Sequence, residues 1–162
     1  MYTSADFKLV CGVLDFEVTV EGKIIALTDS ISATNDGVYL KDPDSGVFYT
    51  MYNNKKGLTL INDEPIFIDM DNKTSSHYNS EEVVSISAGI DSSLWALQND
   101  PDSKDYKVLK WQEDTNRWYK VEGVSGINIA AYNEISLAIV NSDGLVKLSS
   151  SKDQQDDAVY TS

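Results

Sequence analysis

The stretch that decides the fold runs from Val83 to Gly123 and reads VVSISAGIDSSLWALQNDPDSKDYKVLKWQEDTNRWYKVEG. Within it lie four short runs of strand length, rich in β-branched, aliphatic and aromatic residues: 83–88, 94–97, 106–112 and 118–121. Groups of Asp, Asn, Ser and Pro separate the runs, and these residues favour turns because their side chains bond to nearby backbone groups or restrict the backbone. The pattern predicts four consecutive antiparallel strands joined by short connections.

The pattern recurs along the chain. Ile127–Ala131 repeats the apolar spacing of Val84–Ala88, 43 residues further on. Upstream, Val20–Gly22 repeats the Val-Glu-Gly of Val121–Gly123, and an apolar run follows in both places. A period of about 40 residues is typical of units that stack, because one small sheet cannot bury both of its faces. We therefore expect residues 1–162 to form a single domain built from repeats at about 13–56, 57–82, 83–125 and 126–162.

Four antiparallel strands in each repeat are typical of a β-propeller blade. No stretch has the apolar spacing of an amphipathic helix. We predict an all-β, β-propeller-like fold with about four blades of four antiparallel strands, either a small closed ring or a partial propeller. The large aromatics Trp95, Trp111 and Trp118 are expected to fill the space between blades. An open ring would expose an apolar blade face, so a homo-oligomer or a larger assembly is also expected.

Four segments of the decisive stretch share a further pattern: VSISAGID at 84–91, LWAL at 94–97, YKVLKW at 106–111 and WYKVEG at 118–123. In these segments the chain resembles the tectonin repeat, the blade of tectonin-type β-propellers. The resemblance implies recognition rather than catalysis, since members of that family bind sugars or lipopolysaccharide, or serve membrane-traffic and ciliary assemblies. It implies no particular set of binding residues in this chain.

The charge of the chain argues against two classes of partner. There are 26 acidic residues against 13 lysines and arginines, a formal net charge of −13. Proteins that bind nucleic acids or anionic membranes depend on Lys and Arg, so we expect neither partner. No apolar run approaches the ~20 residues of a membrane span, and residues 1–8 lack the basic-then-apolar order of a secretory signal. We expect a cytoplasmic protein, with association with the cilium or cytoskeleton as an alternative.

Residues for catalysis or tight metal binding are sparse. Cys11 and His77 are the only cysteine and histidine, too few for a zinc site, and no Gly-x-Ser-x-Gly motif accompanies His77. Aspartates two residues apart, as at 69 and 71, offer hard oxygens to calcium, but the twelve-residue loop with its closing Glu is absent. Aspartate is also common at turns. We predict no enzymatic activity and no cofactor, with calcium in the Asp-rich loops as the less favoured alternative.

We therefore expect a non-enzymatic binding or scaffold module that mediates protein–protein interaction through its acidic loops. An acidic surface favours a protein partner with a basic surface. The candidate binding residues are Asp42, Asp44, Asp100, Asp102, Trp111, Glu113, Asp114 and Tyr119. The alternative is a carbohydrate-binding lectin of the tectonin type, with a glycan partner and exposed aromatic rings stacked on sugars. The candidates for that role are Tyr39, Tyr106, Trp111, Tyr119 and Tyr132.

Overall fold

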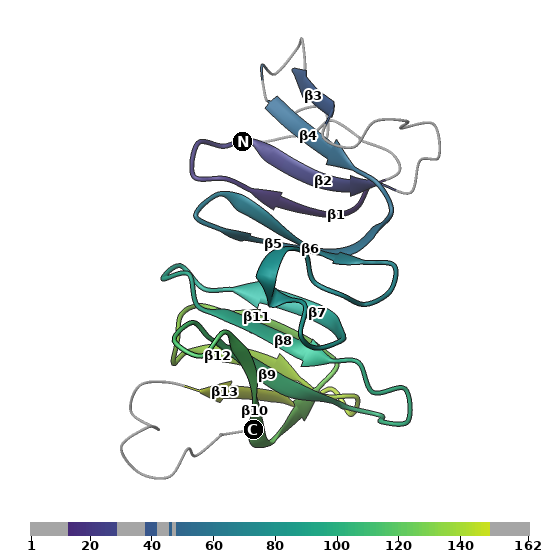
Figure 1. Cartoon of the computed structure of the whole chain (residues 1–162), viewed down its shortest axis with the longest axis vertical. Helices are drawn as coiled ribbons and strands as arrows, with labels where there is room; N and C mark the ends of the chain where they lie inside the picture. The colour runs from purple at the N-terminus through teal and green to yellow at the C-terminus, as the bar shows by residue number, and fades with distance from the viewer. Residues whose placement is uncertain (1–12, 29–37, 42–45, 47, 150–162) are drawn as a thin grey trace, which may run out of the picture. The chain divides into compact units, whose positions relative to one another are not determined.

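The computed structural model describes residues 13–28, 38–41, 46 and 48–149 (Figure 1). These residues form β-strands and one 3-10 helix, with no α-helix among them, so the prediction of an all-β chain is confirmed. In this part of the chain no helix is long and apolar enough to cross a membrane. The chain divides into two compact units, Met1–Asn54 and Lys55–Ser162.

The first unit contains one four-stranded sheet in the order β1-β2-β4-β3. Its strands are β1 (Val13–Val18), β2 (Ile24–Thr28), β3 (Val38–Lys41) and β4 (Phe48–Tyr52). Strands β1 and β2 form a hairpin in which Gly22 adopts a φ of +80°, a conformation that glycine reaches without steric cost. Strand β2, whose residues 25–28 are all buried, is central and pairs in parallel with β4. The prediction of four consecutive antiparallel strands is therefore wrong for this sheet, because the second edge of the buried strand is taken by β4 and not by β3.

Residues 55–149, the described part of the second unit, form three sheets, all antiparallel. The hairpin of β5 (Lys55–Ile61) and β6 (Glu64–Asp69) comes first and is followed by the 3-10 helix η2 (Ser76–Tyr78). The central sheet contains β7 (Val83–Ala88), β8 (Leu94–Gln98), β9 (Tyr106–Gln112) and β10 (Arg117–Gly126). The last sheet contains β11 (Asn128–Ala131), β12 (Leu137–Val140) and β13 (Val146–Ser149). The four strands predicted within 83–123 are confirmed, and they pair in chain order.

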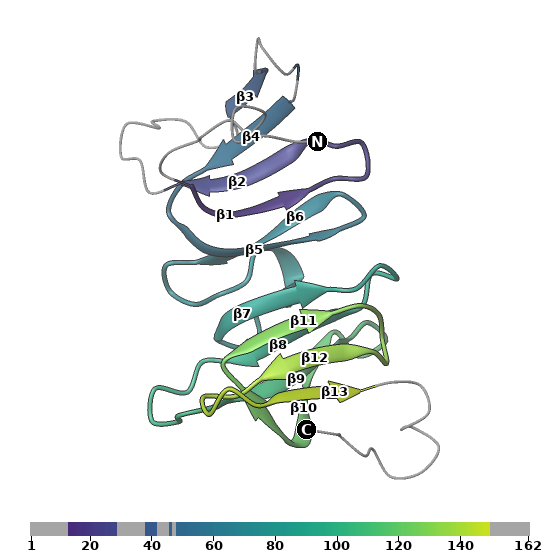
Figure 2. The same cartoon turned by 180° about the vertical axis from the view of Figure 1, so that it is seen from behind.

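The central sheet is covered on both faces at β8. Residues 94–97 are all buried, and successive residues of a strand point to opposite sides of the sheet. On one side, Leu94 and Ala96 of β8 belong to a core cluster with Ile66 and Ile68 of β6. On the other side, Trp95 and Leu97 belong to a cluster with residues of β11 and β12. Seen from behind, β11–β13 lie over the central sheet (Figure 2). The three sheets of this unit are therefore stacked face to face.

The three tryptophans occupy these two cores, so their predicted burial between sheets is confirmed. Trp111 and Trp118 lie in the first cluster and contact each other edge to face, with ring centroids 5.4 Å apart. Trp95 lies in the second cluster. Each ring nitrogen also has an acceptor, as buried indoles require. The acceptors are Asn133 O for Trp95, Glu113 Oε2 for Trp111 and Tyr78 O for Trp118.

The same hydrogen bond joins the first strands of neighbouring sheets at both contacts. The backbone N–H of Ala88 in β7 donates to Thr59 Oγ1 of β5 at 2.9 Å. The N–H of Ala131 in β11 donates to Ser87 Oγ of β7, also at 2.9 Å. Ala88 and Ala131 hold equivalent places in the predicted repeats. A hydroxyl on each preceding strand therefore sets how the next sheet lies against it.

Candidate functional site

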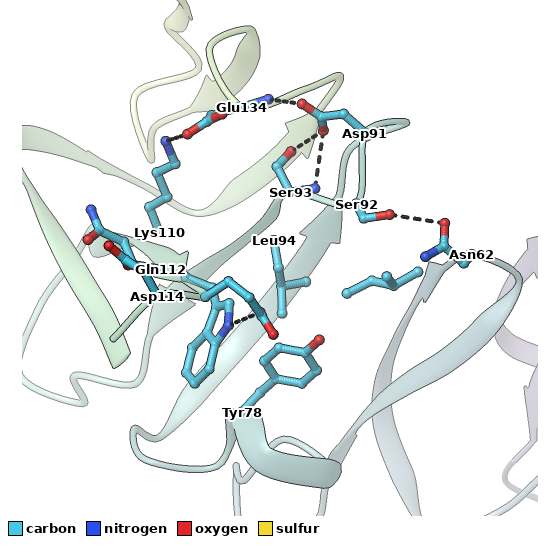
Figure 3. Close-up of a pocket in the computed structure, with 13 residues that line it drawn as sticks. Asn62, Tyr78, Asp91, Ser92, Ser93, Leu94, Lys110, Gln112, Asp114 and Glu134 are labelled. Atoms are coloured by element: carbon cyan, nitrogen blue, oxygen red, sulfur yellow. Dashed lines mark hydrogen bonds and ion pairs between the residues drawn. The ribbon is translucent and has the colours of Figure 1, made fainter. Parts of the chain in front are cut away.

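A pocket of about 730 Å³ opens at one end of the central sheet (Figure 3). Its walls come from alternate strand connections, which lie at the same end because the strands run antiparallel. They are Ile61–Asn62 at the β5–β6 turn, Asp91–Leu94 at the β7–β8 turn, Lys110–Asp114 at the β9–β10 turn, Glu134 before β12, and Tyr78 of η2. Residues more than 70 positions apart in the sequence thus share one site.

The backbone conformation of two turns at the rim of the pocket follows from their local sequence. Asn62 and Asp63 both adopt positive φ, 51° and 65°, as the two-residue turn of a tight hairpin requires, and Asn and Asp tolerate this conformation well. Ser92, in the next turn, has a φ of 68°, and its hydroxyl donates to Asn62 Oδ1 at 3.0 Å. The turns of two neighbouring sheets are therefore linked across the edge of the pocket.

Asp91, in the β7–β8 turn, also bonds to the connection between β11 and β12. One of its carboxylate oxygens accepts hydrogen bonds from the hydroxyl and the N–H of Ser93, at 2.6 and 3.1 Å. The other oxygen accepts from the N–H of Glu134 at 2.9 Å. These bonds, the Ser93 hydroxyl first, lower the pKa of Asp91 below its ordinary value, although desolvation of the carboxylate opposes the shift. Asp91 is therefore a carboxylate with a fixed structural partner at each oxygen.

The base of the pocket is aromatic. The rings of Tyr78 and Trp111 meet edge to face with centroids 4.9 Å apart. Trp111 donates its ring N–H to Glu113 Oε2 at 2.8 Å, which holds this carboxylate at the mouth of the pocket. The carbonyl of Tyr78 accepts hydrogen bonds from Trp118 Nε1 and from Thr74 Oγ1, so the backbone of η2 is anchored in the core. Burial raises the pKa of the Tyr78 phenol, and the charge of Glu113 adds to the effect.

The lining of the pocket carries an excess of negative charge. Four of its residues are acidic, Asp91, Glu113, Asp114 and Glu134, and one is basic, Lys110. The ammonium group of Lys110 lies 2.9 Å from Glu134 Oε1 and 5.3 Å from the centre of the Trp95 ring, so it is already paired. Cations are therefore attracted to Glu113 and Asp114, which follow Lys110 in the same β9–β10 connection and are not its ion-pair partners.

The structure brings together three of the residues predicted as binding residues and separates others from them. Trp111, Glu113 and Asp114 line the pocket. Asp100 and Asp102 lie in the β8–β9 loop at the other end of β8, where Asp100 accepts the N–H of Asp102 and lies 3.8 Å from Lys107 Nζ. Tyr119, on β10 next to Lys110 in register, is 44% exposed and lies outside the pocket lining. Asp42 and Asp44 lie outside the described residues.

The aromatic residues proposed to stack on sugars differ in exposure. Trp111 is buried, and Tyr106 is partly buried against the second core cluster. Tyr119 and Tyr132 are exposed, at 44% and 60%. The side chain of Tyr39 lies outside the described residues. Trp111, the candidate ring that lines the pocket, is thus 7% exposed and packs edge to face with Tyr78 and Trp118, which leaves little of its surface for a sugar.

The Asp-rich segments proposed for calcium are tied up in turns. Asp69 Oδ1 accepts the N–H groups of Asp71 and Lys73, both at 2.9 Å. Asp100 plays the same part for Asp102. Among the described residues, no group of three or more His, Cys, Asp or Glu side chains is placed to hold a metal ion.

Sequence reasoning missed several residues of the pocket, above all Asn62, Tyr78, Asp91, Lys110 and Glu134. The turn containing Asp91 was recognisable as a turn, and the repeat period indicates that turns of successive repeats lie side by side. That signal could have grouped Asp91 with Asn62 and Glu134. No sequence signal identifies Tyr78, which lies in the most diverged part of the repeat pattern.

Comparison of the chain with protein-family models and with curated proteins gives no match.

Proposed function

We propose that this chain is a non-enzymatic binding module that recognises a protein partner with a basic surface through the acidic pocket of its second unit. The observation that carries the proposal is the charge of that pocket, where the only lysine of the lining is already paired with Glu134. Glu113 and Asp114, in the same β9–β10 connection, remain to meet a cation from outside. Rigid sheets commonly present binding residues on their turns, and this pocket is made of turns.

The state of the pocket carboxylates supports binding rather than catalysis. Both oxygens of Asp91 accept structural hydrogen bonds, and its lowered pKa makes it a weak base. Glu113 is held by the ring nitrogen of Trp111. Three pocket carboxylates, Asp91, Glu113 and Glu134, thus have defined partners and are suited to an electrostatic role.

A partial β-propeller of the tectonin type is our proposal for the architecture. Face-to-face stacking of the three sheets in the second unit supports it, as does the repeated bond from Ala88 to Thr59 and from Ala131 to Ser87. The parallel pairing of β2 with β4 in the first unit counts against a regular blade there. Native mass spectrometry tests whether further copies complete a ring, since a closed monomer would give a single mass of 17.9 kDa.

Binding of charged peptides tests the proposed function. The probes are a decapeptide of alternating lysine and arginine and an acidic decapeptide of the same length, titrated while tryptophan fluorescence is recorded. We expect the basic peptide to bind and its affinity to fall with added salt, because salt screens exposed charges. The acidic peptide should not bind. Absence of binding by the basic peptide at low salt would refute the proposed function.

A pair of double variants separates the pocket from net charge alone. Glu113→Gln with Asp114→Asn removes two charges from the pocket. Glu122→Gln with Asp71→Asn removes the same two charges from exposed positions outside it. Each exposed charge pair contributes roughly 0.2–1 kcal/mol, so the pocket variant should weaken binding about 2- to 30-fold. Equal effects of the two double variants would mean that the peptide is attracted by the whole acidic chain and not by the pocket.

The lectin alternative rests on the exposure of Tyr119 and Tyr132. Exposed aromatic rings can stack on sugars. A glycan array separates the two functions, since selective binding of a neutral glycan that persists at high salt would favour the lectin.

A further inference from the structure

The pocket contains a polar group that the rest of the described chain leaves without a partner. Tyr78 is only 8% exposed, and its ring is packed against Trp111. Its hydroxyl points into the pocket (Figure 3). The hydrogen bonds that the described residues make to Tyr78 reach its carbonyl and not its hydroxyl. The ring is buried while the hydroxyl opens into the pocket, so this hydroxyl is available to a ligand atom there.

A negatively charged acceptor lies beside that hydroxyl. Glu113 uses Oε2 to accept the ring N–H of Trp111, whereas Oε1 is 3.8 Å from His77 Nε2, beyond hydrogen-bond distance. The charge of Glu113 also reaches the Tyr78 phenol, where it adds to the effect of burial in raising the pKa. A ligand at the hydroxyl of Tyr78 would therefore meet an available carboxylate oxygen at the same time.

We infer that this pocket takes the guanidinium group of an arginine side chain from the protein partner, an inference that rests on the proposed function. A guanidinium presents five N–H donors in a flat fork, so it can bond to Glu113 Oε1 and to the hydroxyl of Tyr78, while the charge of Asp114 in the lining adds to the attraction. A lysine ammonium is a strongly hydrated point charge with three donors, and it matches separated acceptors less well. The ammonium group of Lys110 is already paired with Glu134 Oε1 and lies over the Trp95 ring.

Three capped pentapeptides test the inference, each with one central residue between glycines and serines. The central residue is arginine, lysine or dimethylarginine, which keeps the charge but blocks hydrogen-bond donors. Binding is followed by tryptophan fluorescence, to which Trp111 at the base of the pocket contributes. We expect the arginine peptide to bind about tenfold more tightly than either of the others, because hydrogen bonds to charged groups are lost in both.

The variant Tyr78→Phe removes only the hydroxyl and leaves the ring in the core. It should weaken the arginine peptide about tenfold and leave the lysine peptide nearly unchanged, with the melting temperature as the check on folding. If Tyr78→Phe does not fold, Glu113→Gln keeps an acceptor for the indole of Trp111 while removing the charge, and it should abolish the preference for arginine over lysine. Equal affinities of the wild-type protein for the three peptides would overturn the inference while leaving the proposed function standing. Failure of all of them to bind, together with failure of the basic decapeptide, would refute the proposed function itself.

Discussion

Replacing Thr59 by valine tests whether the hydroxyl between β5 and β7 holds the sheets of the second unit together. Valine has nearly the shape of threonine, so the substitution leaves no cavity at this position, which is 4% exposed. It removes the acceptor of the Ala88 N–H, which now lies 2.9 Å from Thr59 Oγ1. Leaving a buried donor without a partner costs about 1–3 kcal/mol. We therefore expect the free energy of unfolding to fall by about 1–2 kcal/mol, since the N–H is only partly buried.

Two measurements check this expectation. Urea denaturation gives the change in the free energy of unfolding, and hydrogen exchange followed by NMR gives the protection of the Ala88 amide. The amide should exchange faster in Thr59→Val than in the wild-type protein, because its hydrogen bond is lost. Thr115→Val is the control, since Thr115 is exposed and its hydroxyl lies 3.5 Å from Gln112 O. Unchanged stability together with unchanged protection of Ala88 would show that the hydroxyl does not set the contact between β5 and β7.

Further predictions concern packing, the indole bond and pH. Gly126→Ala should destabilise the second unit by about 1–3 kcal/mol, because a Cβ there would lie 2.6 Å from Val140 O. Thermal unfolding measures the effect, and an unchanged melting temperature would contradict this packing. Trp118→Phe keeps a ring in the core but leaves the Tyr78 carbonyl without its indole donor, so urea denaturation should show a loss of about 1 kcal/mol or more. Because the pKa of Asp91 is lowered in the folded protein, its carboxylate stabilises the fold above the ordinary value of 3.8 and loses that effect as the pH falls through the folded pKa. The stability of Asp91→Asn should thus lie below that of the wild-type protein at pH 6 and approach it below pH 4, and a constant difference at all pH values would contradict the assignment.

The strands of the second unit were predictable because each run between turn residues is short and rich in β-forming side chains. The run 83–88 became β7 without change, and 106–112 became β9. The sheet of the first unit was less predictable. Burial of the whole run 25–28 indicates a central strand. The alternation of apolar and polar residues along a strand does not specify which strand pairs with its other edge. The parallel pairing of β2 with β4 therefore had no signal in the sequence.

The candidate site was predictable only in part. The β9–β10 turn with Glu113 and Asp114 could be expected to be exposed and acidic, and it lines the pocket. Asp100 was an equally good candidate by its sequence, but its loop is at the other end of β8. Tyr78 had no signal, because its part in the site depends on η2 being anchored through its carbonyl to Trp118.

By itself, the amino-acid sequence determined that the chain is built of strands, that it is acidic and where strands β7, β8 and β9 begin and end to within one residue. These properties are local, since strand and turn preferences act over a few neighbouring residues. Only the tertiary structure decided which acids share a pocket. Asp91 meets the N–H of Glu134 because sheets that need cover on both faces stack, and stacking brings their turns to one end.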